Sequence, residues 1–292
     1  AHAFHGMTLG ALACTTNSHF RNAAGVALDN VVHQPFDSGS EQGDKLGGGI
    51  AALDRLRAMY EDSSSGLELP AAFIVETIQA EGGVNVASKE WLLAVQTLAH
   101  DLGALFIVDD IQAGCGRTGS YFSFDGMGLD PDIITLAKGL GGFGTPIAMN
   151  LVKPEHDKLW KPGEHTGTFR GQGMSFVAGK VGLSYFDDDK LMQETKRKGA
   201  IMQESLEALV AEYPQQNFQQ RGRGMMQALD VGNGDLSKKI ASYCFEHGML
   251  CGAVGTGGRA IKLIPPLTIP DEDLTEGLAI FAAAVKSAVG GA

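Results

Sequence analysis

The chain has 292 residues, of which 44% are hydrophobic and 20% are charged, as is usual for a globular protein. This length is enough for one large domain or two. The formal net charge of −11 argues against a nucleic-acid-binding protein, which presents a basic face. No apolar run approaches the roughly 20 residues that cross a bilayer.

The four cysteines, Cys14, Cys115, Cys244 and Cys251, are widely separated. No CxxC pair occurs, so the sequence favours neither a zinc site nor a disulfide framework. Reduced thiols in a cytoplasmic protein are the preferred interpretation. No signal peptide is recognisable at the start of the sequence. We therefore expect a cytoplasmic protein with no metal.

Apolar runs alternate with helically spaced segments up to about residue 190. Residues 88–102 predict a helix with Ser88 as its N-cap. The strand candidates are residues 71–76, 104–108, 132–136 and 146–152. This alternation predicts an α/β fold with a mostly parallel sheet covered by helices.

The pattern changes after residue 190, where residues 190–213 predict a long amphipathic helix that ends before Pro214. The later elements form a βαββα series, with strands at 224–231, 249–252 and 260–264 and helices at 236–247 and 271–288. We predict a large domain at 1–186, a connecting helix at 187–213 and a smaller C-terminal α+β domain at 214–292. The first residues read like the end of a strand inside a domain, so we also expect an N-terminal part of the large domain to be missing.

Carboxylates follow two of the predicted strands. Asp109 and Asp110 end one strand, and Glu76 ends another. Ligands bind at the carboxyl ends of strands in open α/β sheets. Adjacent strand residues point to opposite faces, so only one aspartate can share a ligand with Gln112, and we choose Asp109. The alternatives are that both aspartates are solvated or cap a helix. A magnesium site lacks a second carboxylate cluster.

Lys138 lies among small residues 29 positions after Asp109. An acid and a lysine are what pyridoxal 5′-phosphate (PLP) chemistry requires, because the lysine forms a Schiff base and the acid keeps the pyridine nitrogen protonated. On spacing alone, a surface lysine on a loop is the more common explanation.

Other segments are weak signals one by one. Phe4, beside His5 and Gly6, suits stacking on a planar ring, although a core aromatic is the safer interpretation. Glu81 follows a strand end, or is a solvated loop acid. Thr168 lies in a Gly/Thr-rich turn with Arg170 that suits phosphate, or is a plain turn. Arg259 and Lys262 flank a predicted strand and suit a carboxylate, or are solvated.

Together these segments resemble the class III PLP-dependent aminotransferases of fold type I. The likeness runs along nearly the whole chain and is carried by residues 4–12, 75–83, 108–119, 136–139 and 165–171. It implies that Lys138 is the Schiff-base lysine and proton shuttle. It also implies that Asp109 pairs with the pyridine nitrogen, that Gln112 bonds the ring hydroxyl side and that Phe4 stacks on the ring.

The resemblance also implies a shared active site in a homodimer or higher homo-oligomer, in which Thr168 reaches the cofactor phosphate of the neighbouring subunit. His5, Gly6 and Glu76 would line the cofactor site, and Glu81 would pair with a substrate-binding arginine. Where the family has that arginine, this chain has Lys262, so either Lys262 or Arg259 takes its role. The family also has an N-terminal segment that is absent here.

Within the family, residues 108–119, 142–146, 166–171 and 254–267 resemble one branch. That branch moves an amino group from glutamate to the aldehyde carbon of aspartate semialdehyde. The alternatives are another ω-aminotransferase of the ornithine, 4-aminobutyrate or acetylornithine type, a decarboxylase, an aminomutase or a non-catalytic fragment. A nicotinamide-dependent dehydrogenase is disfavoured because no GxGxxG follows the first strand.

Overall fold

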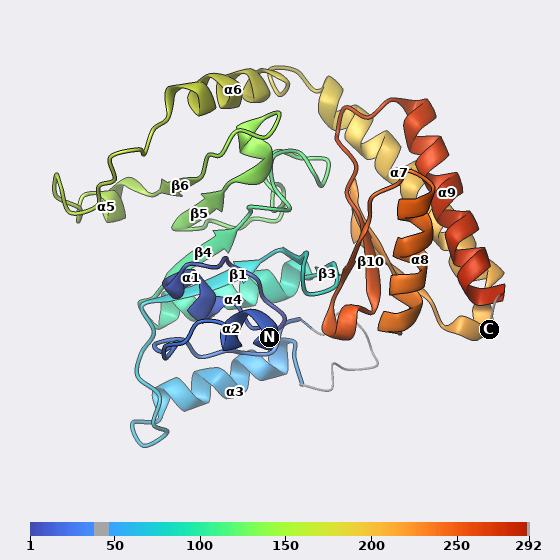
Figure 1. The fold of residues 1–292 in the computed structure, drawn as a ribbon. Helices are drawn as coiled ribbons and strands as arrows, with labels where there is room; N and C mark the ends of the chain where they lie inside the picture. Colours follow the sequence, from blue (N-terminus) through green and yellow to red (C-terminus); the bar gives the residue numbers. More distant parts are fainter. Residues whose placement is uncertain (38–46, 291–292) are drawn as a thin grey trace.

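The computed structural model describes residues 1–37 and 47–290. Over these residues the chain builds two four-stranded sheets and a small two-stranded one. Figure 1 shows the first large sheet beside the N-terminal helices and the second against the three long C-terminal helices. Among the helices described, none is both long and apolar enough to span a membrane.

The first sheet has the strand order β1-β4-β5-β6. Its strands are β1 (Ala72–Glu76), β4 (Leu105–Asp109), β5 (Ile133–Leu136) and β6 (Met149–Val152). The pairs β1–β4 and β4–β5 are parallel, which confirms the mostly parallel sheet. The edge strand β6 is largely exposed. It runs antiparallel to β5, because the link between them holds only the short 3-10 helix η1 (Lys138–Gly141) and no crossover helix.

Helix α4 (Lys89–Asp101) covers this sheet, and its N-cap is Ser88, whose side chain accepts a hydrogen bond from the Trp91 N–H at 3.2 Å. The apolar face of α4 packs on β4 in a buried core that includes Trp91, Leu92 and Phe106. Helix α3 (Ile50–Glu61), which the sequence patterns did not predict, packs against α4.

The first residues are not the strand end that we expected. Residues 1–6 have no regular structure and lead into α1 (Leu9–Cys14) and α2 (Ser18–Asn22). After β1, the short strands β2 (Ile78–Gln79) and β3 (Asn85–Val86) form an antiparallel hairpin. Its turn holds Gly82, where an added Cβ would lie 2.4 Å from the His2 carbonyl oxygen, so the close approach requires glycine.

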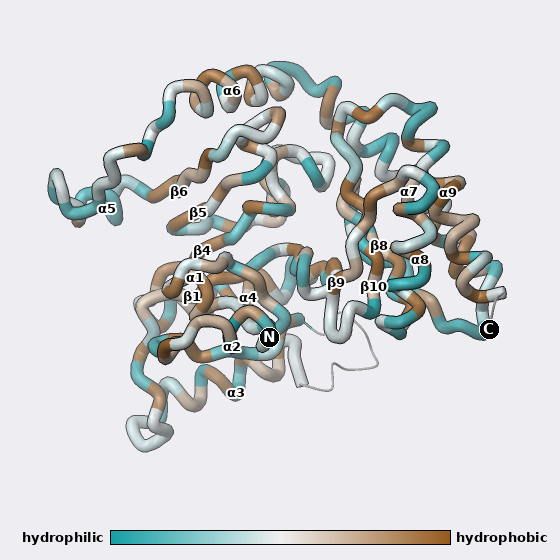
Figure 2. Tube along the Cα trace, in the orientation of Figure 1, coloured by the Kyte–Doolittle hydropathy of each residue, from teal (hydrophilic) through white to brown (hydrophobic). Residues whose placement is uncertain are grey.

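A long excursion follows β6. It contains α5 (Pro154–Asp157) and α6 (Gly173–Ser184) and runs along the outer side of the first sheet (Figure 1). Much of α6 is hydrophobic in Figure 2, and its Met174, Phe176 and Val177 are exposed. An apolar helix face left in solvent indicates an interaction surface.

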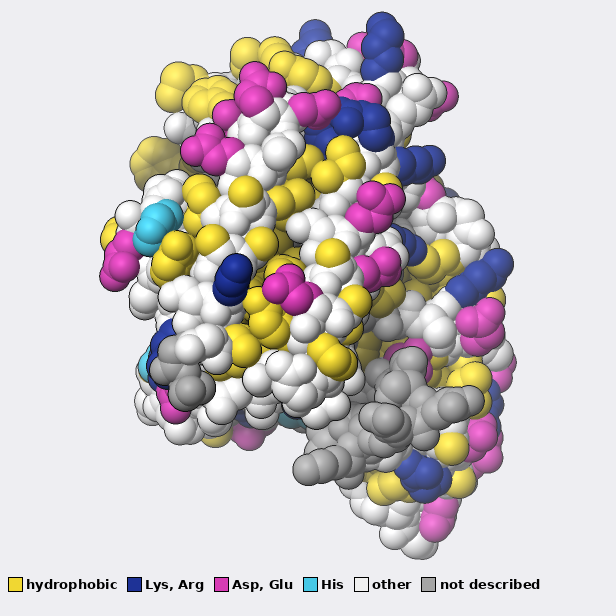
Figure 3. Space-filling view, turned by 90° about the vertical axis from the view of Figure 1, so that its right-hand side faces the viewer, with side chains coloured by type: hydrophobic (Ala, Val, Ile, Leu, Met, Phe, Trp, Pro, Cys, Tyr) yellow, Lys and Arg dark blue, Asp and Glu magenta, His cyan; other side chains and the backbone are white. Residues whose placement is uncertain are grey.

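The second sheet is antiparallel throughout, with the order β7-β8-β10-β9. Its strands are β7 (Gln219–Arg223), β8 (Met226–Asp230), β10 (Ala260–Leu263) and β9 (Gly252–Val254). It packs against α7 (Lys190–Glu212), α8 (Gly234–Glu246) and α9 (Asp271–Gly290) around a core that includes Met202, Leu206, Leu229, Ile240 and Phe281. The short 3-10 helices η2 (Pro214–Gln216) and η3 (Thr256–Gly258) lie in its connections. Figure 3 shows acidic, basic and hydrophobic side chains interspersed on the face turned toward its viewer.

In this region one strand was not predicted and another was predicted at the wrong position. Strand β7 was missed because its sequence, Gln-Gln-Arg-Gly-Arg, carries no apolar alternation. The strand expected at 249–252 lies later, at β9. Residues before it form the turn that ends α8, where the Met249 N–H donates to the Cys244 carbonyl at 2.8 Å. The domain boundaries at 186 and 213 stay a prediction.

Candidate active site

The ends of three strands place the main candidate residues along one edge of the first sheet. Glu76 and Asp109 are register partners at the last positions of β1 and β4. Lys138 follows β5 after one residue, at the start of η1. Since β1, β4 and β5 are parallel, their carboxyl ends meet at this edge, which is where ligands bind in such sheets.

Asp109 is a buried carboxylate held from two sides. Its side chain is only 5% exposed, and its Oδ2 lies 2.7 Å from Nδ1 of His5, itself 4% exposed. Its Oδ1 accepts a hydrogen bond from the Ile111 N–H at 3.1 Å. The orientation of Asp109 is therefore fixed by its own turn and by an imidazole from the N-terminal segment.

Thr15 and Glu76 hold the segment Phe4–His5–Gly6 across the strand ends. The Phe4 N–H donates to Glu76 Oε1 at 3.0 Å, and the His5 N–H donates to Thr15 Oγ1 at 3.0 Å. The Thr15 hydroxyl is also 3.0 Å from the Gly6 carbonyl, to which it can donate. Thr15 is fully buried and was not predicted as a site residue, because a lone threonine in an irregular segment carries no signal in the sequence.

Two more buried acids lie behind Asp109. Burial raises the pKa of Glu76 to about 7, against the lowering effects of the His5 charge and the Phe4 N–H. Burial likewise raises the pKa of Asp110 to about 6, although Asp110 Oδ2 accepts a hydrogen bond from the Ser123 N–H at 3.0 Å. Asp110 thus contacts Ser123 and Asp109 contacts His5, as expected for neighbours on opposite faces of a strand.

We expect the stability of the protein to fall as the pH rises through the range in which Glu76 titrates. The pKa of Glu76 is higher in the folded state than in the unfolded state, so between these two values only the folded state keeps Glu76 protonated. The stability that this protonation provides is lost as the pH increases from about 4.5 to about 7. The variant Glu76→Gln keeps an acceptor for Phe4 and removes this titration. Between pH 5 and pH 8, the wild-type free energy of unfolding should fall by up to about 3 kcal/mol more than that of the variant.

Urea unfolding at several pH values measures this difference. Asp110 titrates in a similar range but is present in both proteins, so its contribution cancels in the comparison. Parallel stability curves for the two proteins would show that Glu76 is already ionised at pH 5.

Lys138 has an uncommitted amine. Among the described residues, its side chain makes no hydrogen bond or ion pair, and it is exposed. Its φ of +47° lies in the left-handed region, which is costly for a residue with a side chain, and such strained residues cluster at functional sites. Its charge is close enough to Glu81 to lower the pKa of that acid.

A second cluster joins the two large sheets. Lys262 of β10 places its Nζ 2.5 Å from Glu81 Oε1 and 2.6 Å from Gln112 Oε1, and Gln112 Nε2 donates to the same Glu81 oxygen at 3.2 Å. Lys262 is 8% exposed and Glu81 is 40% exposed. Burial raises the pKa of Glu81, but the hydrogen bond and charge of Lys262 outweigh it, so the net shift is downward.

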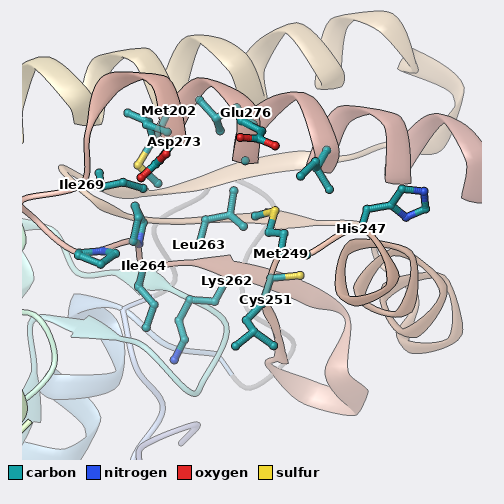
Figure 4. Close-up of a pocket in the computed structure, with 18 of the residues that line it drawn as sticks. Met202, His247, Met249, Cys251, Lys262, Leu263, Ile264, Ile269, Asp273 and Glu276 are labelled. Carbon is teal, nitrogen blue, oxygen red and sulfur yellow. The ribbon is translucent and has the colours of Figure 1, made fainter.

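Lys262 also borders a cavity of about 710 Å³ within the second sheet and its helices. Figure 4 shows its ammonium directed away from the apolar lining, which includes Met202 and Leu263. The cavity therefore lies behind Lys262 and is separate from the cluster with Glu81.

Arg259 does not contact Glu81. Its Nε donates to Asp230 Oδ1 at 2.8 Å, and Arg221 holds the other oxygen of this fully buried aspartate at 2.5 Å. The sequence left open whether Arg259 or Lys262 is the cation beside Glu81. The geometry favours Lys262.

Thr168 lies apart from the other candidate residues. Within the described part of the chain, no hydrogen bond or ion pair joins it to Lys138, Asp109 or Gln112. It lines a separate hollow of about 1020 Å³ between the start of β6 and the segment before α6, together with His165 and Arg170. In the residues described, no group of histidine, cysteine or acidic side chains is arranged to hold a metal ion.

Comparison with known proteins identifies the family. The model of "Aminotransferase class-III" matches residues 1–285. The chain belongs to the class III aminotransferases. It is 44% identical over 289 residues to a diaminobutyrate–2-oxoglutarate transaminase of Sporosarcina pasteurii, covering 98% of this chain and 66% of the relative. It is 46% identical over 288 residues to the enzyme of that name from Wolinella succinogenes, covering 99% and 65%.

Solved structures agree with this family. The ornithine aminotransferase of Toxoplasma gondii, described with partial occupancy of PLP at its active site, superposes with a TM-score of 0.82 at 27% identity, covering 99% of this chain and 63% of that one. The chain thus spans less than two thirds of the length of the first curated relatives.

The residues present fit PLP, the cofactor of class III aminotransferases. Asp109 is a fixed, buried carboxylate suited to a protonated ring nitrogen, and Lys138 is an amine with no competing acid partner. Next to Lys138, an added Cβ on Gly139 would come within 3.1 Å of Cys115 Cβ, so this turn is tightly packed. Phe4, His5, Gly6 and Gln112 border the same edge.

Proposed function

We propose that this protein transfers an amino group from L-glutamate to L-aspartate 4-semialdehyde, giving L-2,4-diaminobutyrate and 2-oxoglutarate. The relatives from S. pasteurii and W. succinogenes, named for this activity, support the choice of substrates. The observation that carries the proposal is the placement of Asp109 and Lys138 at one edge of the first sheet, together with the Lys262–Glu81 pair, which Lys262 links to Gln112 in the turn after Asp109.

In this proposal each residue has a defined task. When bound, PLP supplies an electron sink that stabilises negative charge on the substrate carbon. Asp109, held by His5, would place its carboxylate against the ring nitrogen. The amine of Lys138 would take a proton from the substrate carbon as general base and deliver it as general acid to the cofactor carbon that receives the amino group. Phe4, whose N–H donates to Glu76, would cover one face of the ring.

Lys262 and Glu81 provide a switchable site for the substrate carboxylate. A paired Lys262 is neutralised by Glu81, whereas a freed Lys262 is a nearly buried cation that binds a carboxylate strongly. Glu81 is the more exposed partner and so is the side chain that can move. Gln112 contacts both and can hold Lys262 in place when Glu81 leaves.

We also propose a homodimer or larger homo-oligomer with a shared active site. Phe143 and Phe169 are 89% and 93% exposed, and the exposed apolar face of α6 lies on the same excursion as Phe169. Such a face needs a partner, and a second copy of the chain would supply it. Thr168, placed away from Lys138 of its own chain, could then serve the cofactor phosphate of the neighbouring subunit.

A coupled assay on purified protein tests the reaction. With PLP, glutamate and aspartate semialdehyde, we expect 2-oxoglutarate and diaminobutyrate to form in equal amounts. Ornithine, 4-aminobutyrate and acetylornithine should be poorer donors with 2-oxoglutarate as acceptor. Faster turnover of one of these would assign the protein to another ω-aminotransferase, and turnover without any keto or aldehyde acceptor would indicate an aminomutase.

A further inference from the structure

The turn that carries Thr168 also carries an unpaired arginine. The Arg170 N–H donates to the Gly167 carbonyl at 3.0 Å and closes this turn, and Gly171 follows in the left-handed region with φ of +78°. Residues 161–174 are all exposed. The turn is therefore presented to solvent on the excursion that we assign to the subunit interface.

The side chain of Arg170 folds back over its own turn. A Cβ added to Gly167 would lie 2.9 Å from Arg170 Nε and 3.1 Å from its Cγ. Glycine at position 167 thus leaves room for the arginine stem to lie on the backbone beside Thr168. Arg170, Thr168 and His165 line the same hollow of about 1020 Å³.

Arg170 differs from every other arginine in the described part of the chain. The other guanidinium groups each make a hydrogen bond or ion pair, either with carboxylates or with backbone carbonyls. Arg170 makes neither, in a chain with 34 acidic and 23 basic residues. A guanidinium presents a rigid fork of donors that matches the oxygens of a carboxylate or phosphate. An unpaired fork beside a hydroxyl is suited to an oxyanion.

We propose that Arg170 acts across the subunit interface and binds an oxyanion in the partner's active site, beside Thr168. The oxyanion is either the phosphate of the cofactor or a carboxylate of the substrate. This inference rests on the proposed function and its shared active site. It assigns to Arg170 a direct ligand contact.

Cofactor titrations of the dimeric protein separate the two sources of the oxyanion. Fluorescence titration gives the dissociation constants of PLP and of pyridoxal, which lacks the phosphate. If Arg170 binds the phosphate, Arg170→Ala should weaken PLP about 10- to 100-fold and leave pyridoxal unchanged. If it binds the substrate, PLP binding should be unchanged and the KM for glutamate should rise by a similar factor. Arg170→Lys, which keeps the charge without the fork, should lie between.

Lys161→Ala is the matched control, because Lys161 is an exposed cation of the same excursion that does not line the hollow. Lys161→Ala should leave the dissociation constants of PLP and pyridoxal and the KM for glutamate unchanged. Wild-type values of both dissociation constants and of the glutamate KM in Arg170→Ala would overturn the proposal. Equal losses of affinity in Lys161→Ala would also overturn it, because they would show that the effect comes from the overall positive charge of this surface.

Mixed dimers test whether Arg170 acts across the interface. After subunits of Lys138→Ala and Arg170→Ala are exchanged, half of the mixed dimer's sites regain both an intact Lys138 and an intact Arg170. About one quarter of all sites should then be restored, giving activity above that of the two parent proteins combined. No gain on mixing would show that Arg170 acts within its own subunit.

These results are distinguishable from a failure of the proposed function. A wild-type protein that neither binds PLP nor consumes glutamate contradicts the function itself. A wild-type protein that does both, with Arg170→Ala indistinguishable from it, contradicts only the role of Arg170.

Discussion

Replacing Lys138 with alanine is expected to reduce transamination by at least about 1000-fold, because the same amine is proposed as nucleophile and as proton carrier. The structure supports this large effect in one respect. Lys138 makes no hydrogen bond or ion pair with another described residue, so its removal costs neither. The unfolding midpoint of the protein without cofactor should therefore change little, and alanine keeps the tightly packed turn before Gly139.

Steady-state rates of 2-oxoglutarate formation, together with thermal unfolding, measure both parts of this prediction. Lys239→Ala is a suitable control, since Lys239 is an exposed lysine on α8 that is not one of the candidate site residues. Near wild-type turnover by Lys138→Ala would remove Lys138 from the mechanism. A large loss of stability would instead indicate a structural role.

The parallel part of the fold was predictable because its signals are local. The apolar runs of β1, β4 and β5 and the Ser88 cap of α4 follow from short stretches of sequence. Parallel strands bring their carboxyl ends together, so the sequence predicts that Glu76 and Asp109 lie on the ligand side of the sheet. The antiparallel direction of β6 was not predicted, because the direction of a strand depends on the segment that connects it to its neighbour and not on its own residues.

The contacts that complete the site were not predictable in the same way. His5 meets Asp109 across 104 positions, and Lys262 meets Glu81 across 181. No spacing rule connects residues so far apart, and only the packing of the two sheets chooses Lys262 over Arg259. The polar strand β7, which carries Arg221 toward Asp230, also has no apolar signature to reveal it.

Replacing Asp109 with asparagine should lower kcat by about 100- to 1000-fold, the loss usual when one preorganised electrostatic partner of a reaction is removed. Asparagine has nearly the shape of aspartate and can still accept the Ile111 N–H, so the turn after β4 should persist. It cannot carry the negative charge that would hold a proton on the ring nitrogen. The loss should therefore appear in kcat more than in the KM for glutamate.

Asp110→Asn is the matched control for this prediction, because it makes the same chemical change one residue away at an equally buried position on the opposite face. Burial raises the pKa of Asp110 to about 6, so asparagine replaces a carboxyl that ionises only at a cost. The kcat of Asp110→Asn should stay near the wild-type value, and its free energy of unfolding above pH 6 should be higher than that of the wild type. If the two variants lose kcat equally, the buried acids act together through the structure of the strand end. If only Asp109→Asn loses kcat, the reaction depends on the negative charge of Asp109, which His5 holds in place.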